Sequence, residues 1–465
     1  MGLISLRSKA WHGDVEVQLS VPDSWSVEVL PPRDAFELDD SGLQQALCTP
    51  IGSPPLTELA RGNERVLIVV DDLGRPTPAH RIIPFVLEHL RDAGVADGSI
   101  SFLVATGSHR QLESAEMAMK IGTDVAQRFE CHSHDAFHDE LADLGRLPSG
   151  MPVLINRRVT DADLVIGISC VLPHSLAGFS GGGKILLPGC AGIQSISALH
   201  SFESKRLRAH REPLQRRPDT REVIAAFAER VGLGFSINTV INSRREIAGV
   251  HAGHFVKAHA RAVDQARKVF DTPIPEDLRQ QAELLIVNGY PLDADPVQIS
   301  KSQWSCKLFP RATTIFHNPA CDGEAYHGWS EFQKDSVLNM LCGAIGEART
   351  QGRYPGMVSA LLSLPFLCAL GHRRLCRQAQ RTDVSYRAFR ARDRRIFQQT
   401  LAKRLMAKRT HIVICSEGFP EWKRAIQFPN SQLYSSWEEV GRAGHLPDRP
   451  IRVAVLTCAP LQIPS

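Results

Sequence analysis

The stretch RVLIVVDDLGRPTP, residues 65–78, joins a run of mostly β-branched apolar residues to a loop that contains Asp, Gly and Pro. After this loop, apolar side chains recur at the spacing of one helical face, at Ile82, Ile83, Val86, Leu87 and Leu90. A strand, a loop and a helix in this order form one βα unit. The stretch therefore predicts a parallel sheet of the α/β class.

The same pattern of a short apolar run before a Gly-, Pro- or Asp-containing loop recurs along the chain. It predicts a second helix over Glu113–Ile121. The strands that it predicts are Arg65–Val70, Ile100–Ala105, Leu164–Ser169, Phe235–Ile241, Leu284–Val287, Thr313–Phe316, His411–Cys415 and Ile451–Leu456.

Length and proline placement predict how the chain is divided. At 465 residues it is about twice as long as a single hydrophobic core usually sustains. Residues 269–278 (VFDTPIPEDL) carry two prolines between a helical pattern and a strand, which suits a linker. We expect one α/β domain over residues 1–272 and a second over 273–448, with a cleft between them. Residues 449–465 are expected to return to the first domain as a C-terminal strand.

Composition excludes several classes of protein. The chain is 43% apolar and 22% charged, as ordinary globular proteins are. Its 54 basic and 50 acidic residues leave a net charge of +4, too small to predict a nucleic-acid or membrane partner. The 11 cysteines include no C-x-x-C pair and the N-terminus lacks a signal-peptide pattern, so a reducing, cytoplasmic location is expected.

One segment departs from this even charge. Residues 373–409 hold 13 Lys or Arg and two Asp. Apolar residues at helical spacing within the segment favour a solvated basic helix. A nucleic-acid-binding surface stays open as the alternative for this segment.

Polar residues follow three of the predicted strands, where ligands bind in open α/β sheets. They are Asp71, Asp72 and Arg75 after the first strand, His109 after the second, and His174 and Lys184 after the third. Taken singly, each has an ordinary structural explanation, since Asp caps helices and most histidines are structural. Together, two imidazoles and two cations at one sheet edge predict proton transfer and anion binding.

The segment GFSGGGK, residues 178–184, has the spacing of a phosphate-binding G-x-x-x-x-G-K loop. Ile185 stands where such a loop needs Ser or Thr for Mg²⁺, and Pro188 would disturb the helix that follows. The pattern therefore argues against a nucleoside triphosphatase. Its backbone N–H groups remain candidates to hold another phosphate.

A set of motifs in one order resembles the nickel-dependent lactate racemase family. The resemblance covers the chain from about residue 14 to its end. The motifs are IGSPPL (51–56), DDLGRPTP (71–78), ATGSHR (105–110), PHSLAGFSGGGKILLPG (173–189), His200, NGYPLD (288–293) and QISK (298–301).

The resemblance implies a cofactor and the residues that hold it. Members carry a nickel-pincer nucleotide, a Ni(II) pyridinium-3,5-bisthiocarboxylate mononucleotide, so the first domain would be the cofactor-binding one. Lys184 would attach the cofactor covalently and His200 would ligate nickel, completing a roughly square-planar site. The loop that would hold the nucleotide is Asp72, Leu73, Gly74 and Arg75. The Gly-rich turn beside Lys184 would lie near its phosphate.

The resemblance also implies an isomerase, a racemase or epimerase of a 2-hydroxy acid. Hydride would move reversibly to the cofactor, because the C–H bond beside the hydroxyl is too weak an acid for direct deprotonation by histidine. His109 and His174 would be the two catalytic acid/base residues. Arg75, Gln298 and Lys301 would bind the substrate, with Arg75 and Lys301 at its carboxylate. The partners implied are the small 2-hydroxy acid and the cofactor-synthesis enzymes.

Two positions depart from the family's commoner pattern. Val297 stands where Tyr is frequent, and Gly183 where Arg is frequent. A missing phenol leaves room for a larger or more apolar 2-hydroxy acid than lactate. Two alternatives to this function stay open: another hydride-transfer reaction on an α-hydroxy carbonyl compound, or a non-catalytic nucleotide- or nucleic-acid-binding protein that uses the basic segment 373–409.

Overall fold

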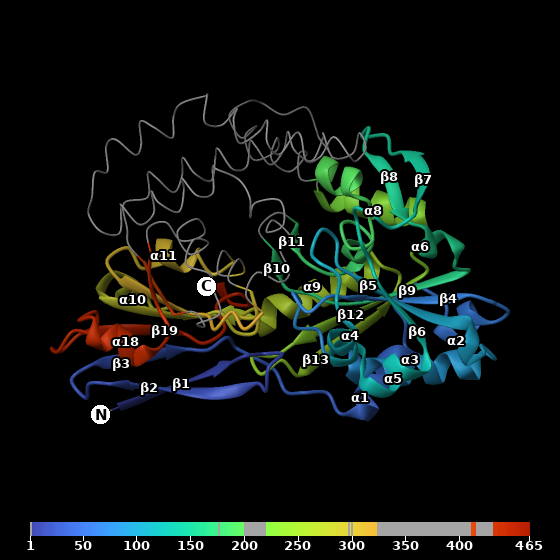
Figure 1. Cartoon of the computed structure of the whole chain (residues 1–465). Helices are drawn as coiled ribbons and strands as arrows, with labels where there is room; N and C mark the ends of the chain where they lie inside the picture. Colours follow the sequence, from blue (N-terminus) through green and yellow to red (C-terminus); the bar gives the residue numbers. More distant parts are fainter. Residues whose placement is uncertain are drawn as a thin grey trace, which may run out of the picture. The chain divides into compact units, whose positions relative to one another are not determined.

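The computed structural model describes residues 2–174, 177–199, 220–295, 298, 301–322, 411–414 and 431–465. The chain forms two compact units. The first unit contains residues 31–273 and 461–465, and the second contains residues 1–30 and 274–460. Both units combine a six-stranded sheet with helices, so the predicted α/β class is confirmed (Figure 1).

The first unit is built on a sheet in the order β13-β12-β9-β4-β5-β6. Its strands are β4 (Val66–Asp71), β5 (Ile100–Ala105), β6 (Glu130–Ser133), β9 (Leu164–Cys170), β12 (Phe235–Ile241) and β13 (Ile247–Gly253). All neighbours are parallel except β12 and β13. Every residue of β4, β9 and β12 is buried, as expected of parallel strands covered on both faces.

Helices cover both faces of this sheet. The helices are α1 (Asp40–Cys48), α2 (Leu56–Ala60), α3 (Ala79–Asp92), α4 (Ser114–Ile121), α5 (Thr123–Arg128), α6 (Arg157–Asp161), α8 (Thr220–Val231) and α9 (Lys257–Val269), with short 3-10 turns η1 (Asp97–Ser99) and η2 (Gly182–Ile185). In Figure 1, α3 and α5 lie below the sheet and α8 above it. Three two-stranded pairs complete the unit: β7 (Leu141–Arg146) with β8 (Pro152–Asn156), β10 (Pro173–His174) with β11 (Gly178–Phe179), and β14 (Asp271–Thr272) with β20 (Ile463–Pro464).

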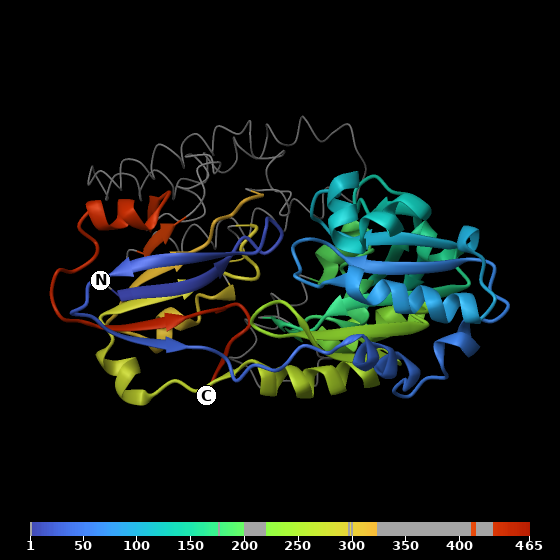
Figure 2. The same ribbon diagram turned by 90° about the horizontal axis from the view of Figure 1, so that it is seen from below.

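The second unit has an all-parallel sheet in the order β18-β17-β16-β15-β19-β3. Its elements are β1 (Gly2–Ser8), β2 (Val15–Val21), β3 (Ser26–Leu30), α10 (Glu276–Gln281), β15 (Leu284–Asn288), α11 (Ser305–Leu308), β16 (Thr313–His317), β17 (His411–Ile414), β18 (Ser431–Tyr434), α18 (Trp437–Arg442) and β19 (Arg452–Leu456). Side chains alternate along β15: Ile286 packs under the β1–β2 hairpin, whereas Leu285 and Val287 pack against the α10 side. Figure 2 shows the hairpin crossing this sheet.

The observed division differs from the predicted one at both ends of the chain. The boundary falls between Pro273 and Ile274, inside the predicted linker, but residues 1–30 belong to the second unit. The reason is pairing: β3 adds to the edge of the second sheet beside β19. Residues 449–460 stay with the second unit for the same reason, and only residues 461–465 return to the first, where β20 pairs with β14.

The predicted strands match β4, β5, β9, β12, β15, β16, β17 and β19 to within one residue at each end, and the second predicted helix matches α4. The basic segment 373–409 lies outside the described residues. Within the described ranges, no helix is both long enough and apolar enough to cross a membrane.

The second unit buries two titratable side chains with opposite pKa shifts. Burial raises the pKa of Asp293 to about 6, although its carboxylate accepts backbone N–H bonds from Lys9 and Ala10 at 2.6 and 3.1 Å. Burial lowers the pKa of His317 to about 4, and its Nε2 lies 3.1 Å from Oγ of Ser8. Between about pH 4 and 6, Asp293 makes the folded state less stable as pH rises, whereas His317 makes it more stable.

Replacing His317 with Gln should remove the histidine's contribution to the pH dependence of stability. Between pH 4 and 6.5 the histidine is largely protonated in the unfolded chain but largely neutral when buried in the folded one. Protonation therefore favours the unfolded state at low pH, and wild type gains stability relative to the variant as pH rises. We expect that difference to grow by about 2–3 kcal/mol from pH 4 to 6.5. All six tryptophans fall in the residue ranges of the second unit, so urea unfolding followed by tryptophan fluorescence measures the unfolding free energy of that unit. A difference that is independent of pH would show that His317 does not titrate as stated.

Candidate functional site

Three neighbouring strands of the first unit, β9, β4 and β5, end at the same edge of the sheet. The loops that follow them are tied together by hydrogen bonds. Oδ2 of Asp71, at the end of β4, accepts a bond from the Cys170 amide at the end of β9, at 3.3 Å. The Gly107 amide, after β5, donates to the carbonyl of Gly189 at 2.8 Å. The predicted convergence of these loops is therefore present within this unit.

His109 pairs with Asp72 at this edge. Nδ1 of His109 lies 2.5 Å from Oδ2 of Asp72, and the two side chains are 16% and 4% exposed. Burial alone would raise the pKa of Asp72, but the charges of His109, Arg75 and Lys120 outweigh it and hold the pKa below its usual range. Because a carboxylate accepts hydrogen bonds, Nδ1 of His109 carries the shared proton, and Nε2 is the ring atom with the lone pair of a base.

A fully buried lysine on α4, Lys120, contacts the backbone of the loop that carries Asp72 and Arg75. Nζ of Lys120 lies 2.6 Å from Oδ1 of Asp71 and donates to the carbonyls of Asp72 and Arg75, both at 3.0 Å. Oδ2 of Asp71 also accepts a bond from Thr77 Oγ1 at 2.6 Å. Lys120 therefore fixes the backbone of the loop that carries Asp72 and Arg75.

The rest of that loop is compact. Leu73 is buried, and the Arg75 guanidinium donates to the carbonyl of Gly74 at 2.8 Å. A Cβ atom at Gly74 would lie 3.1 Å from Oδ1 of Asp72 and 3.5 Å from Cε1 of His109. Glycine at this position therefore keeps the space beside the Asp72–His109 pair open.

His174 and Lys184 form a second pair. Nζ of Lys184, on η2, lies 3.4 Å from Nε2 of His174, at the end of β10. Nδ1 of His174 accepts a hydrogen bond from the Ala177 amide at 3.2 Å, which leaves Nε2 as the ring atom that faces the amine. Both side chains are partly exposed, so a ligand can reach them.

Arg221 and His259 hold the loop between these two residues. The Arg221 guanidinium donates to the carbonyls of Ala177 and Gly181 at 3.2 and 3.1 Å, and also to that of Phe179. Nε2 of His259 lies 2.8 Å from the Ser180 carbonyl. Burial lowers the pKa of His259 to about 4, and the Arg221 charge adds to the effect, so the ring is neutral and donates.

The glycine run is required by packing. Gly181 and Gly182 have φ of 84° and 59°, and added Cβ atoms would approach Val171 to 2.8 Å and the Phe255 carbonyl to 3.0 Å. The Gly182 amide donates to Oδ1 of Asn238 at 2.8 Å. That amide is therefore already bonded within the protein and is not one of the N–H groups that could hold a phosphate. At Gly183 a Cβ would lie 2.9 Å from that of Ala228 on α8, which accounts for the small residue there.

The remaining predicted residues lie elsewhere. Gln298 is buried and Lys301 half-buried, both in the second unit. His200 and Val297 lie outside the described residues. The described residues contain no cluster of three or more His, Cys, Asp or Glu arranged to hold a metal ion.

Comparisons with known proteins identify the family of the chain. Residues 12–210 match the family model of the lactate racemase N-terminal domain. A lactate racemase from Thermoanaerobacterium thermosaccharolyticum is 33% identical over 312 residues, which span 64% of this chain and 71% of that protein. A lactate racemase from Lactiplantibacillus plantarum is 34% identical over 292 residues, spanning 62% of this chain and 68% of that protein.

Solved structures show the same fold. The lactate racemase apoprotein from T. thermosaccharolyticum matches with a TM-score of 0.66 and 22% identity over 100% of both chains. A protein from Thermotoga maritima matches with a TM-score of 0.59 and 17% identity over 92% of this chain and 100% of that one. Since two lactate racemases are more than 30% identical to this chain over more than two thirds of their own length, the chain belongs to the lactate racemase family, whose members are isomerases.

Proposed function

We propose that the protein racemises or epimerises a 2-hydroxy acid by reversible hydride transfer to a nickel-pincer nucleotide attached at Lys184. The observation that carries the proposal is the presence of two imidazoles, each with a fixed partner, at one sheet edge beside a lysine amine. His109 is paired with Asp72, and His174 lies against Lys184. Binding an anion would need neither histidine, whereas moving a proton on and off a hydroxyl group needs a base and an acid.

The described residues fit a group held at this edge. Lys184 lies on a turn whose glycines are closely packed, and its side chain is partly exposed. Gly74 leaves open the space that a Cβ would fill beside Asp72 and His109. Asp72, Leu73, Gly74 and Arg75 would line the nucleotide, and His200 would ligate nickel. When bound, this group supplies an electrophilic carbon that accepts hydride.

The chain's own residues would manage the protons. Nε2 of His109 accepts the hydroxyl proton of one enantiomer, and the carboxylate of Asp72 stabilises the imidazolium that results. Nε2 of His174 exchanges a proton with the oxygen of the other enantiomer. Inversion follows when the flat 2-keto acid turns between these two transfers.

Three residues are proposed to bind the substrate. Arg75 can grip a carboxylate through two N–H groups, and Lys301 adds a second positive charge. Oε1 of Gln298 is buried and has no hydrogen-bond partner among the described residues, which suits a contact to a bound molecule. A cytoplasmic location and maturation by cofactor-synthesis enzymes complete the proposal.

Producing the protein together with cofactor-synthesis enzymes and nickel tests this function. Intact mass should show an adduct on wild type and on a Lys268→Ala control, which removes an exposed lysine of α9, but not on Lys184→Ala. Chiral chromatography of a panel of 2-hydroxy acids should then show inversion by wild type and the control only.

The outcomes separate the alternatives. An adduct without inversion, but with oxidation or reduction of an α-hydroxy carbonyl compound, would favour the other hydride-transfer reaction. A wild-type protein without adduct under conditions that load a known lactate racemase would refute attachment at Lys184. Salt-sensitive nucleic-acid binding without any turnover would support the binding alternative.

A further inference from the structure

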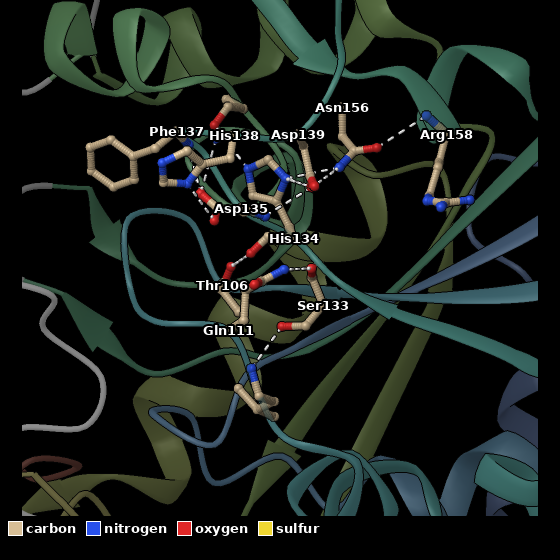
Figure 3. Close-up of polar contacts among 12 residues, drawn as sticks. Thr106, Gln111, Ser133, His134, Asp135, Phe137, His138, Asp139, Asn156 and Arg158 are labelled. Carbon is tan, nitrogen blue, oxygen red and sulfur yellow. Dashed lines mark hydrogen bonds and ion pairs between the residues drawn. The ribbon is translucent and has the colours of Figure 1, made fainter. Parts of the chain in front are cut away.

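A second histidine network lies one strand away from the candidate site, around the fully buried His134 (Figure 3). His134 directly follows β6, which pairs with β5. Its amide donates to the carbonyl of Val104 at 3.0 Å, and its own carbonyl accepts a bond from Oγ1 of Thr106 at 2.5 Å. The main chain of His134 is therefore bonded to the segment that leads to His109.

The side chain of His134 reaches the segment that follows Lys184. Its Nε2 lies 3.1 Å from the carbonyl oxygen of Ala191. That carbonyl belongs to the same short stretch as Gly189, whose carbonyl accepts the Gly107 amide at 2.8 Å. One residue thus contacts both the segment that leads to His109 and the segment that follows Lys184, close to the point where those segments contact each other.

The hydrogen bonds assign the protons on the ring. A carbonyl oxygen only accepts, so Nε2 carries a proton and donates to Ala191. Nδ1 then accepts from Nδ2 of Asn156, at 3.0 Å. The Asn156 amide orientation is fixed, because its Oδ1 accepts the Arg158 amide at 3.0 Å and its Nδ2 also donates to Oδ2 of Asp139 at 2.6 Å.

Asp139 completes the network as an anion. Burial alone would raise its pKa, but the hydrogen bond from the Asp135 amide at 2.8 Å and the nearby charge of Arg158 help to hold the pKa below its usual range. Figure 3 shows His134, Asp139 and Asn156 side by side, with Thr106 on the other side of His134. Every polar atom of the imidazole therefore has a fixed partner, which prevents the ring from turning.

We propose that His134 is a positioning residue, whose Nε2–H bond to the Ala191 carbonyl holds the His109 loop in register with the segment after Lys184. The effect of this bond on catalysis rests on the proposed function, whereas its effect on the positions of the two segments does not. Displacing a catalytic group by even about 1 Å lowers rates strongly, so a buried link of this kind matters to turnover.

Two substitutions of His134 separate this role from general packing. In His134→Gln, the side-chain amide reaches the position of Nε2 and keeps the bond to Ala191. In His134→Asn, the amide reaches only the position of Nδ1 and the Ala191 carbonyl loses its partner. His132→Asn, on the partly exposed neighbour in β6, is the matched control.

Hydrogen exchange of the unloaded protein, followed by mass spectrometry of peptides over residues 104–110, measures the link directly. We expect exchange about tenfold faster in His134→Asn than in wild type, with His134→Gln and His132→Asn close to wild type. If His134→Asn fails to fold, the His134→Gln variant provides the test. Exchange in His134→Gln at the wild-type rate then supports the proposal. Fast exchange in His134→Gln, or unchanged exchange in a folded His134→Asn, overturns it.

In the enzyme that carries the cofactor, kcat should be about tenfold lower for His134→Asn than for wild type, and close to wild type for His134→Gln and His132→Asn. KM should be nearly unchanged and the Lys184 adduct complete. If wild type inverts no 2-hydroxy acid, the proposed function fails, and the exchange experiment still decides the positioning role. If wild type inverts its substrate and His134→Asn matches it in both kcat and exchange, only the positioning role is refuted.

Discussion

The His109→Gln variant should invert its 2-hydroxy acid about 10²–10⁴-fold more slowly than wild type, which is the usual contribution of one general base. Gln fills much of the space of the ring, but its amide reaches the position of Nε2 rather than that of Nδ1, which pairs with Asp72, and it cannot take up a proton. The cofactor adduct on Lys184 should be unaffected, because His109 does not touch that residue in any described contact. Intact mass and chiral chromatography of the same sample measure both quantities.

Two further variants test whether the loss of rate in His109→Gln comes from lost proton transfer. Asp72→Asn keeps a hydrogen-bond acceptor for Nδ1 but removes the charge, so the rate should fall less than in His109→Gln. Since His109 lowers the pKa of Asp72, Asp72 equally favours the charged imidazole, and its removal should move the acidic limb of the pH–rate profile to lower pH. His138→Gln, on a side chain that is 77% exposed, is the control. Full activity in His109→Gln would remove this residue from the mechanism.

The convergence of the three loops could be predicted because it depends only on topology. Apolar runs identify parallel strands, and the residues after their carboxyl ends must meet at one edge when the strands are neighbours. Asp72, His109 and His174 follow β4, β5 and β9, which are neighbours in the sheet. The role of each residue in that group came from the resemblance to a family, because spacing alone does not assign roles.

The residues that support the site could not be predicted in the same way. Lys120 lies on the buried side of α4, His134 follows the edge strand β6, and Arg221 lies in the first turn of α8. Each acts on carbonyl groups that are far away in the sequence, and no local pattern distinguishes such a side chain from an exposed one. A lysine at a position where the helical period predicts an apolar residue is the only signal that Lys120 offered.

The ends of the chain were also hidden from sequence reasoning. Residues 15–21 (VEVQLSV) do alternate between apolar and polar side chains, but this alternation does not say which sheet they cover, and β3 has only five residues, of which Leu30 alone is buried. Such a strand identifies no partner until the sheet edge beside β19 is known. Strand order in a sheet depends on long-range pairing, which short apolar runs do not encode.

The Lys120→Met variant should lose about 3–5 kcal/mol of unfolding free energy in the first unit, which is the usual cost of removing one partner of a buried ion pair. Met has a similar length and fills the space, so the loss is electrostatic. Asp71, which is 8% exposed, would lose the cation 2.6 Å away, and the carbonyls of Asp72 and Arg75 would lose a donor.

The first unit contains no tryptophan, so circular dichroism and hydrogen exchange in β4 must follow its unfolding in urea, while tryptophan fluorescence follows the second unit. Lys268→Met, on an exposed lysine, should behave as wild type. Asp71→Asn combined with Lys120→Met should recover more than half of the loss, because the amide oxygen still accepts from Thr77 and position 71 no longer carries a carboxylate that needs the lysine. A Lys120→Met protein as stable as wild type would mean that the lysine does not hold this loop, and a double variant no better than the single one would place the cost in lost packing instead.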